Sequence, residues 1–166
     1  MDSMRIGFGN DIHRFDPDRD LFLCGCRIPC HLGGLLGHSD ADAPLHAVID
    51  ALLGALALGD IGHFFPDTDP AYKDADSRML LSSVLEHPAF QGWHVVNLDM
   101  TIQAQEPRLA PYISVMRESL AGLLRTDISR VSIKAKTAEG LDAVGKCQAI
   151  QAAAVVLLMQ DQNLKS

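Results

Sequence analysis

The chain has 166 residues, of which 48% are hydrophobic and 21% charged, and its formal net charge is −7. This length and composition are typical of one globular domain with a buried core. The negative charge argues against a non-specific nucleic-acid surface, because a phosphate backbone is bound by basic faces. The longest apolar runs are too short to span a bilayer, and the first residues lack the features of a signal or transit peptide. We therefore expect a cytoplasmic protein with no nucleic-acid or membrane partner.

Apolar periodicity, turn residues and helix caps predict strands and helices in the order ββααβαβα. The strands are expected over residues 5–15, 21–29, 93–105 and 131–136. The helices are expected over residues 43–58, 77–87, 109–124 and 146–160. The first two strands should pair as a hairpin, and the last helix should be buried because it is apolar nearly all round. We predict one α+β domain over residues 1–166, a two-layer fold with helices on one face of a mixed, mostly antiparallel sheet.

A candidate metal site is visible in the first predicted strand and helix. Asp11 and His13 are two residues apart and therefore point to the same face of the strand. His46 lies near the start of the helix, and Asp50 follows four residues later on the same helical face. One carboxylate and two imidazoles form a set that zinc takes in catalytic sites, with Asp50 expected to orient His46. The same residues also fit a surface carboxylate and hydrogen-bonded histidines, so the pattern alone leaves both interpretations open.

Four segments together resemble the 2-C-methyl-D-erythritol 2,4-cyclodiphosphate synthase family. They are RIGFGNDIHRF, LLGHSDADAPLHAVIDALLGALALGDIGHFFPDTDP, TIQAQEPRLAPYI and SIKAKTAEGLDAVG. The resemblance covers residues 4 to about 158 and implies a cyclising phosphorus–oxygen lyase of non-mevalonate isoprenoid precursor biosynthesis. Such an enzyme converts 4-diphosphocytidyl-2-C-methyl-D-erythritol 2-phosphate to 2-C-methyl-D-erythritol 2,4-cyclodiphosphate and CMP.

The resemblance also implies site residues. The family's metal ligands, usually for zinc, match Asp11, His13 and His46. A second divalent ion at the diphosphate, usually magnesium or manganese, is implied at Glu139. The catalytic set implied is His38, Thr137 and Glu139. The methylerythritol phosphate and the ribose are expected to contact His38, Ser39, Asp60, Ile61, Gly62, Phe65 and Asp67. The cytosine and the nucleotide phosphates are expected to contact Ala104, Gln105, Glu106, Pro107, Arg108, Leu109, Lys136, Thr137 and Lys146.

The family resemblance implies a homotrimer that shares each site between neighbouring chains. The chain itself favours an oligomer, because the apolar last helix needs more core than a two-layer domain offers. The strand over 93–105 also exposes a polar face, which consists of Asn97, Asp99, Thr101 and Gln103; its apolar face consists of Val96, Leu98, Met100, Ile102 and Ala104. Phe8 and Ala153 stand where His and Glu are common in the family. The family's binding of an isoprenoid diphosphate in a cavity on the trimer axis is therefore not carried over to this chain.

Two other functions fit parts of the pattern. A metal-dependent phosphoesterase acting on a cytidylyl or sugar-alcohol phosphate would use the same three ligands to activate water. It would have no use for the segment TIQAQEPRLAP, and its product would be linear rather than cyclic. A catalytically silent member kept for binding or assembly would not need Asp11, His13, His46 and Glu139 to be intact.

Overall fold

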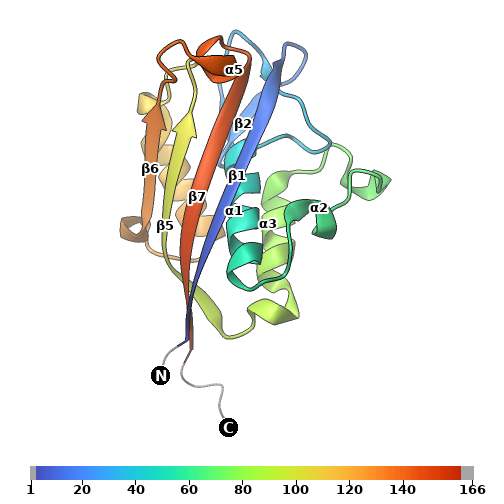
Figure 1. Ribbon diagram of the computed structural model, residues 1–166, viewed down its shortest axis with the longest axis vertical. Helices are drawn as coiled ribbons and strands as arrows, with labels where there is room; N and C mark the ends of the chain where they lie inside the picture. The colour runs from blue at the N-terminus through green and yellow to red at the C-terminus, as the bar shows by residue number, and fades with distance from the viewer. Residues whose placement is uncertain (1–2, 162–166) are drawn as a thin grey trace.

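The computed structural model of the protein describes residues 3–161 (Figure 1). Its strands are β1 (Met4–Asp16), β2 (Leu21–Leu23), β3 (Cys26–Ile28), β4 (Gly34–Leu35), β5 (Trp93–Gln103), β6 (Val131–Lys136) and β7 (Ala149–Gln160). Its α-helices are α1 (Ala43–Ala55), α2 (Ile61–Phe64), α3 (Ser77–Glu86), α4 (Ile113–Leu123) and α5 (Asp142–Gly145). Short 3-10 turns span Pro70–Tyr72, Pro88–Phe90, Ala110–Tyr112 and Ile128–Arg130.

Five strands form one sheet in the order β4-β1-β7-β5-β6, and β2 pairs with β3 alone. The pairings are antiparallel except for the parallel pair β5 and β6. The longer helices lie behind the sheet in Figure 1 and cover one of its faces. The predicted α+β class and the mixed, mostly antiparallel sheet are therefore confirmed. Among residues 3–161, no helix is long and apolar enough to cross a membrane.

The prediction of a helix over residues 146–160 is wrong. Most of this stretch is β7, which lies between β1 and β5 and pairs antiparallel with both. Alternate side chains of β7 are buried under the helices: Ile150, Ala152, Ala154, Val156 and Leu158. A central strand that has few polar residues on either face shows no alternation of polar and apolar residues. Its sequence is a continuous apolar run, which periodicity does not distinguish from a buried helix. The argument for an oligomer that rested on an apolar last helix falls with this prediction.

The predicted hairpin over residues 5–29 is also wrong. β1 pairs with β7 along most of its length and meets β4 at Phe15 and Asp16. Residues 21–28 form their own small hairpin, in which Leu21 faces Ile28. Cys24 and Gly25 make its turn at φ angles of 56° and 74°. A 13-residue β1 finds a partner of matching length in the 12-residue β7, whereas β2 and β3 have three residues each.

Two glycines allow α1 to lie directly on β1. A Cβ atom on Gly7 would be 1.7 Å from the carbonyl oxygen of Ala51, and one on Gly9 would be 2.0 Å from that of Ala47. No side chain fits at such a separation, so the strand presents bare backbone to the helix. The small Ala47 and Ala51 complete the contact. This close approach sets the position of α1, and with it the position of His46, relative to β1.

The other face of the sheet is open and carries both apolar and polar side chains. Five apolar residues on it are well exposed: Met4 at 61%, Ile6 at 73%, Phe8 at 64%, Ile12 at 49% and Val155 at 42%. The polar residues predicted on β5 lie on this face. The apolar residues predicted to face the core are confirmed except at one position. A register shift between Val95 and Asn97 turns Val95 into the core in place of Val96. The bulge adds one residue to the strand, so the alternation changes phase there.

Candidate metal centre

Two packed elements bring Asp11, His13 and His46 together. Asp11 and His13 follow Gly7 and Gly9 on the face of β1 that α1 covers. His46 lies in the first turns of α1. The start of this helix is held by Asp42, whose carboxylate accepts the N–H of Leu45 at 3.0 Å. The imidazole of His46 therefore lies over the last part of the strand, beside the side chains of Asp11 and His13.

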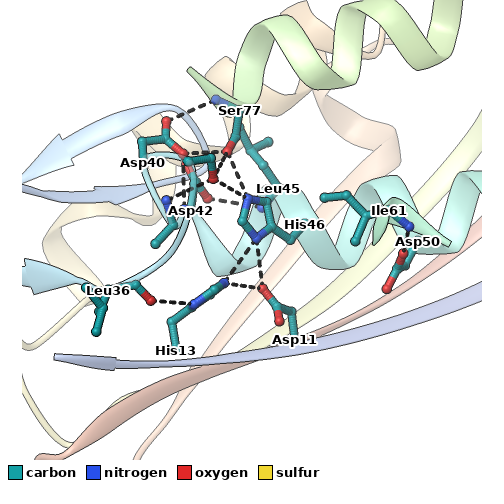
Figure 2. A network of polar contacts seen from close by, with 12 residues as sticks. Asp11, His13, Leu36, Asp40, Asp42, Leu45, His46, Asp50, Ile61 and Ser77 are labelled. Atoms are coloured by element: carbon teal, nitrogen blue, oxygen red, sulfur yellow. Dashed lines mark hydrogen bonds and ion pairs between the residues drawn. The ribbon is translucent and has the colours of Figure 1, made fainter. Parts of the chain in front are cut away.

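The three candidate ligand atoms form a small triangle (Figure 2). Oδ2 of Asp11 lies 2.9 Å from Nε2 of His13 and 3.0 Å from Nδ1 of His46. The two ring nitrogens are 3.1 Å apart. Within residues 3–161, this is the one group of three or more His, Cys, Asp or Glu side chains close enough to hold a metal ion. The structure thus brings together the three residues that the sequence singled out as ligands.

Each imidazole is held at its other ring nitrogen. Nδ1 of His13 donates to the carbonyl oxygen of Leu36 at 2.8 Å. Nε2 of His46 lies 3.0 Å from the Oγ atoms of both Ser39 and Ser77. These contacts leave Nε2 of His13 and Nδ1 of His46 directed into the triangle. Ligating histidines in metal sites are oriented in the same way, by a hydrogen bond on the far side of the ring.

The carboxylate and the imidazoles also shift each other's titration. Burial would raise the pKa of Asp11, but hydrogen bonds from His13 and His46 and their charges outweigh it and hold that pKa well below its usual range. Burial would lower the pKa of His13, but the hydrogen bond and the charge of Asp11 raise it above its ordinary value of 6.5. In the metal-free protein an ionised Asp11 thus favours a protonated His13, and a bound cation replaces that proton.

The donor set fits a divalent cation of the zinc type. Catalytic zinc sites take three protein ligands, often imidazole nitrogens and a carboxylate oxygen, and keep one position open. Here one oxygen and two nitrogens converge, and each ring is oriented from behind. The chemistry of the donors therefore supports a divalent-metal site at Asp11, His13 and His46.

The expected role of Asp50 in orienting His46 is wrong. Both ring nitrogens of His46 contact other groups, and Oδ1 of Asp50 accepts the N–H of Ile61 at 2.7 Å instead (Figure 2). Burial raises the pKa of Asp50, and the negative charges of Asp60 and Asp11 add to this rise, while the Ile61 hydrogen bond opposes it. The i+4 spacing places Asp50 on the correct side of α1, but one turn beyond the metal triangle.

A cavity of about 320 Å³ lies beside the triangle. It is lined by the three candidate ligands, by the loop before α1 and by the segment around α2. The predicted substrate residues in this lining are His38, Ser39, Ile61, Gly62, Phe65 and Asp67. The ring of Phe65 packs edge to face on that of Tyr72, with 5.1 Å between the centroids. The cavity therefore offers space, with one aromatic wall, for a ligand next to a bound cation.

The segment predicted to bind a cytosine lines a different cavity, of about 330 Å³. This cavity lies where the chain leaves β5 and β6. The predicted residues found there are Ala104, Gln105, Glu106, Pro107, Arg108, Leu109, Lys136 and Thr137. The two cavities share no lining residue. Within one chain, the candidate metal centre and the cytosine segment thus form separate hollows.

The remaining predicted site residues, Asp60, Glu139 and Lys146, line neither of these cavities. Asp60 caps α2, where its carboxylate accepts the N–H of His63 at 2.8 Å. Glu139 lies between β6 and α5 with a φ of 51°, and its carboxylate accepts the hydroxyl of Thr137 at 2.8 Å. Lys146 directly follows α5. A single chain thus does not gather all the predicted residues into one site.

Asp40 and Ser77 acquire a role that sequence reasoning missed. Neither residue caps the helix beside it, because the caps of α1 and α3 are Asp42 and Asp76. Asp40 accepts hydrogen bonds from both the N–H and the hydroxyl of Ser77, and Ser77 in turn contacts His46. Ser77 is 31 residues from His46 in the sequence. No periodic pattern connects residues at such a separation, so only the packing of α3 against α1 reveals the contact.

Comparison with known proteins extends the similarity over nearly the whole chain. Residues 4–159 match the YgbB family. The chain is 56% identical to the curated 2-C-methyl-D-erythritol 2,4-cyclodiphosphate synthase of Moorella thermoacetica over 156 residues, which cover 94% of this chain and 95% of that protein. A solved structure of a synthase of that name, in a CDP-bound form, matches with a TM-score of 0.84 and 41% identity over 93% of this chain and 99% of the other. The bifunctional IspDF of Campylobacter jejuni matches with a TM-score of 0.90 and 35% identity over 96% of this chain, which spans 43% of that longer protein.

Proposed function

The chain belongs to the YgbB family of 2-C-methyl-D-erythritol 2,4-cyclodiphosphate synthases, and we propose that its active site is built on zinc held by Asp11, His13 and His46. The enzyme is a cyclising lyase of the non-mevalonate route to isoprenoid precursors. It converts 4-diphosphocytidyl-2-C-methyl-D-erythritol 2-phosphate to the cyclic diphosphate and CMP. The observation that carries the site assignment is the convergence of three ligand atoms on the wall of a cavity. We place the activity in the cytoplasm, as the sequence leads us to expect.

The residue types around the cavity suit a reaction in which the substrate supplies its own nucleophile. The 2-phosphate attacks the β-phosphorus of the diphosphate, CMP leaves, and an eight-membered ring remains. No activated Ser, Cys or strong base is needed, so catalysis rests on positioning and charge neutralisation. Asp11, His13 and His46 would hold a divalent cation, which would supply positive charge to neutralise the phosphates; a chain of net charge −7 has little other positive charge to offer them.

Two pairs of residues are assigned to the phosphates. His38 and Ser39 contact the methylerythritol phosphate, and the ring of His38 is held by donation from Nε2 to the carbonyl oxygen of Asp69 at 3.2 Å. Thr137 contacts the nucleotide phosphates, and Glu139 holds magnesium or manganese there. The hydrogen bond between Thr137 and Glu139 supports this pairing, because it keeps the two side chains adjacent. The remaining substrate contacts are assigned to Asp60, Ile61, Gly62, Phe65, Asp67, Lys136, Lys146 and residues 104–109.

We further propose a homotrimer in which each active site is shared between chains. The separate cavities for the metal triangle and the cytosine segment support this, because one chain alone offers each half of a site in a different place. The open face of the sheet supports it as well. Its exposed Ile6, Phe8 and Val155 form apolar surface that a second copy can bury.

The metal assignment is tested by replacing one ligand. His46→Ala should lose both bound zinc and turnover, measured by elemental analysis of the purified protein and by CMP release. His63→Ala is the matched control, because His63 is an exposed imidazole on α2 that belongs to neither cavity. Stoichiometric zinc in the His46→Ala protein would contradict the assignment.

The shared site is tested with two variants that are inactive for different reasons. His46→Ala lacks the metal ligand, and Arg108→Glu reverses the charge in the cytosine segment. Mixed trimers formed by refolding the two together contain interfaces at which an intact metal site meets an intact cytosine cavity. Refolded mixtures should therefore recover part of the activity, while mixing the separately folded proteins should not. Mixed trimers that form but stay inactive would place both residue sets on one chain.

A further inference from the structure

A chain of hydrogen bonds runs from Asp40 through Ser77 to the far side of the His46 ring (Figure 2). The hydroxyl of Ser77 donates to Oδ1 of Asp40, and its oxygen lies 3.0 Å from Nε2 of His46. Oδ2 of Asp40 accepts the backbone N–H of Ser77 at 3.0 Å. Ser77 is 0% exposed and His46 is 8% exposed. Bulk water therefore does not compete for these contacts.

The carboxylate fixes the direction of the whole chain. An ionised carboxylate only accepts hydrogen bonds, so the hydroxyl proton of Ser77 points toward Asp40. The lone pairs of the Ser77 oxygen then face Nε2 of His46. When a cation replaces the proton that Nδ1 of His46 donates to Asp11, the one proton of the neutral ring lies on Nε2, where the Ser77 oxygen accepts it at 3.0 Å. A neutral imidazole has one N–H, so Nδ1 keeps its lone pair and directs it into the metal triangle.

We propose that Asp40 and Ser77 are positioning residues of the metal centre, which hold His46 in the tautomer and orientation that ligate the cation through Nδ1. The inference rests on the proposed metal site. Ser39, whose hydroxyl is also near Nε2, does not impose a direction in the same way. Its oxygen accepts the N–H of Ala41 at 3.2 Å, and within residues 3–161 the hydroxyl otherwise contacts only His46 and the Ser77 hydroxyl, at 3.0 and 3.5 Å, and not a carboxylate. The pair of Asp40 and Ser77 is therefore the part of the network that selects the tautomer.

The fold holds Asp40 firmly enough for this role. Its N–H donates to the carbonyl oxygen of Ala75 at 3.0 Å, and its Oδ1 also accepts the N–H of Asp42 at 3.2 Å. Asp40 thereby joins the loop before α1 to the start of α3, whose first residue is Ser77. The orientation of a ligand on α1 thus depends on a helix that carries no ligand itself.

The first test measures zinc affinity by competition with a chelator. Ser77→Ala and Asp40→Asn should each weaken zinc binding by roughly ten- to a hundred-fold, the usual cost of removing the group that orients a ligating histidine. Ser83→Ala is the matched control on α3, because its hydroxyl bonds only to the carbonyl oxygen of Met79 at the surface. This control should bind zinc as the unaltered protein does. Unchanged affinity in Ser77→Ala would overturn the proposal.

A double variant separates one chain of bonds from two independent effects. If Asp40 acts through Ser77, then Ser77→Ala combined with Asp40→Asn should weaken zinc binding about as much as either change alone. Fold-losses that multiply in the double variant would contradict a chain that runs through Ser77.

The second test reads the His46 ring directly in the zinc-loaded protein. NMR of the imidazole N–H should find the Nε2–H proton of His46 hydrogen-bonded and slow to exchange with solvent in the unaltered protein and in Ser83→Ala. In Ser77→Ala, this proton should exchange faster and its signal should shift upfield. An identical Nε2–H signal in both would show that Ser77 does not hold the ring. An unaltered protein that binds no zinc would refute the proposed metal site, whereas equal zinc affinity of the unaltered protein and Ser77→Ala would refute only the role of Ser77.

Discussion

Oδ1 of Asp50 accepts a 2.7 Å hydrogen bond from the backbone N–H of Ile61. Asp50 follows His46 by one turn of α1, and Ile61 begins α2 on the wall of the cavity. The same helix therefore carries a candidate metal ligand and fixes the start of the segment assigned to the substrate. The spacing between the candidate metal site and the start of α2 is in this way set by α1.

Loss of this bond should affect substrate binding rather than metal binding. Asp50→Ala leaves the Ile61 N–H without its partner, at a cost of about 1–2 kcal/mol, which corresponds to roughly a tenfold rise in KM. Bound zinc should stay stoichiometric. Asp50→Asn keeps an acceptor oxygen and serves as the control with KM close to that of the unaltered enzyme. Zinc loss in Asp50→Ala at an unchanged KM would return Asp50 to the role of orienting His46.

Glu139 should separate the two cations. Glu139→Gln removes the charge but keeps an oxygen that accepts the Thr137 hydroxyl, so the local conformation should persist. The variant should retain zinc and lose magnesium-dependent turnover, measured by CMP release over a magnesium titration. Full activity at low magnesium would disprove the assignment of Glu139.

Gly9 should be intolerant of any side chain. The added methyl of Gly9→Ala meets the backbone of α1 at 2.0 Å and forces the helix away from β1. The free energy of unfolding should fall by about 1–3 kcal/mol or more, and zinc binding should weaken because His46 moves with the helix. Gly122→Ala is the control, since nothing lies within 4 Å of its Cβ position on α4. That change should raise stability by about 0.5–1 kcal/mol. Equal stability of the two variants in urea unfolding would contradict the close packing.

Some of the fold and the site followed from local patterns, while the rest depended on contacts between distant segments. Asp11 and His13 are two residues apart on one strand, and His46 lies near the start of the helix predicted over residues 43–58. Strand alternation and helical periodicity were therefore sufficient to single out all three. β7 was misread because both of its faces are apolar over several residues, and only its pairing with β1 and β5 defines it as a strand.

The polar contacts of His46 and Asp50 with other elements could not be predicted from the sequence either, because they too depend on the packing of distant segments. The bond from Ser77 to His46 spans 31 residues and forms only when α3 packs on α1. The 11-residue step from Asp50 to Ile61 depends on the path of the loop after α1, so the i+4 rule suggested His46 as the partner instead. Spacing identifies residues that share a face, but their partners on other elements are set by packing.

The metal-free protein should show a window of pH in which the Asp11 and His13 pair contributes to stability. The pKa of Asp11 is lowered on folding, so its contribution is present above the ordinary value of 3.8 and is lost as the pH falls through the folded pKa. The pKa of His13 is raised, so its contribution is full below 6.5 and is lost as the pH rises through the folded pKa. Urea unfolding across this range should show the free energy of unfolding falling on the alkaline side, as the contribution of His13 is lost. In Asp11→Asn this fall should be absent. Parallel profiles for the two proteins would contradict the pairing.

The measurement that tests the central claim most directly is the identity of the product made by the zinc-loaded enzyme with magnesium. Phosphorus NMR of the reaction with 4-diphosphocytidyl-2-C-methyl-D-erythritol 2-phosphate should show CMP and two coupled phosphorus signals from a cyclic diphosphate, with no inorganic phosphate. Release of inorganic phosphate with a linear product would mean that the triangle of Asp11, His13 and His46 serves hydrolysis, and the cyclisation account would be wrong.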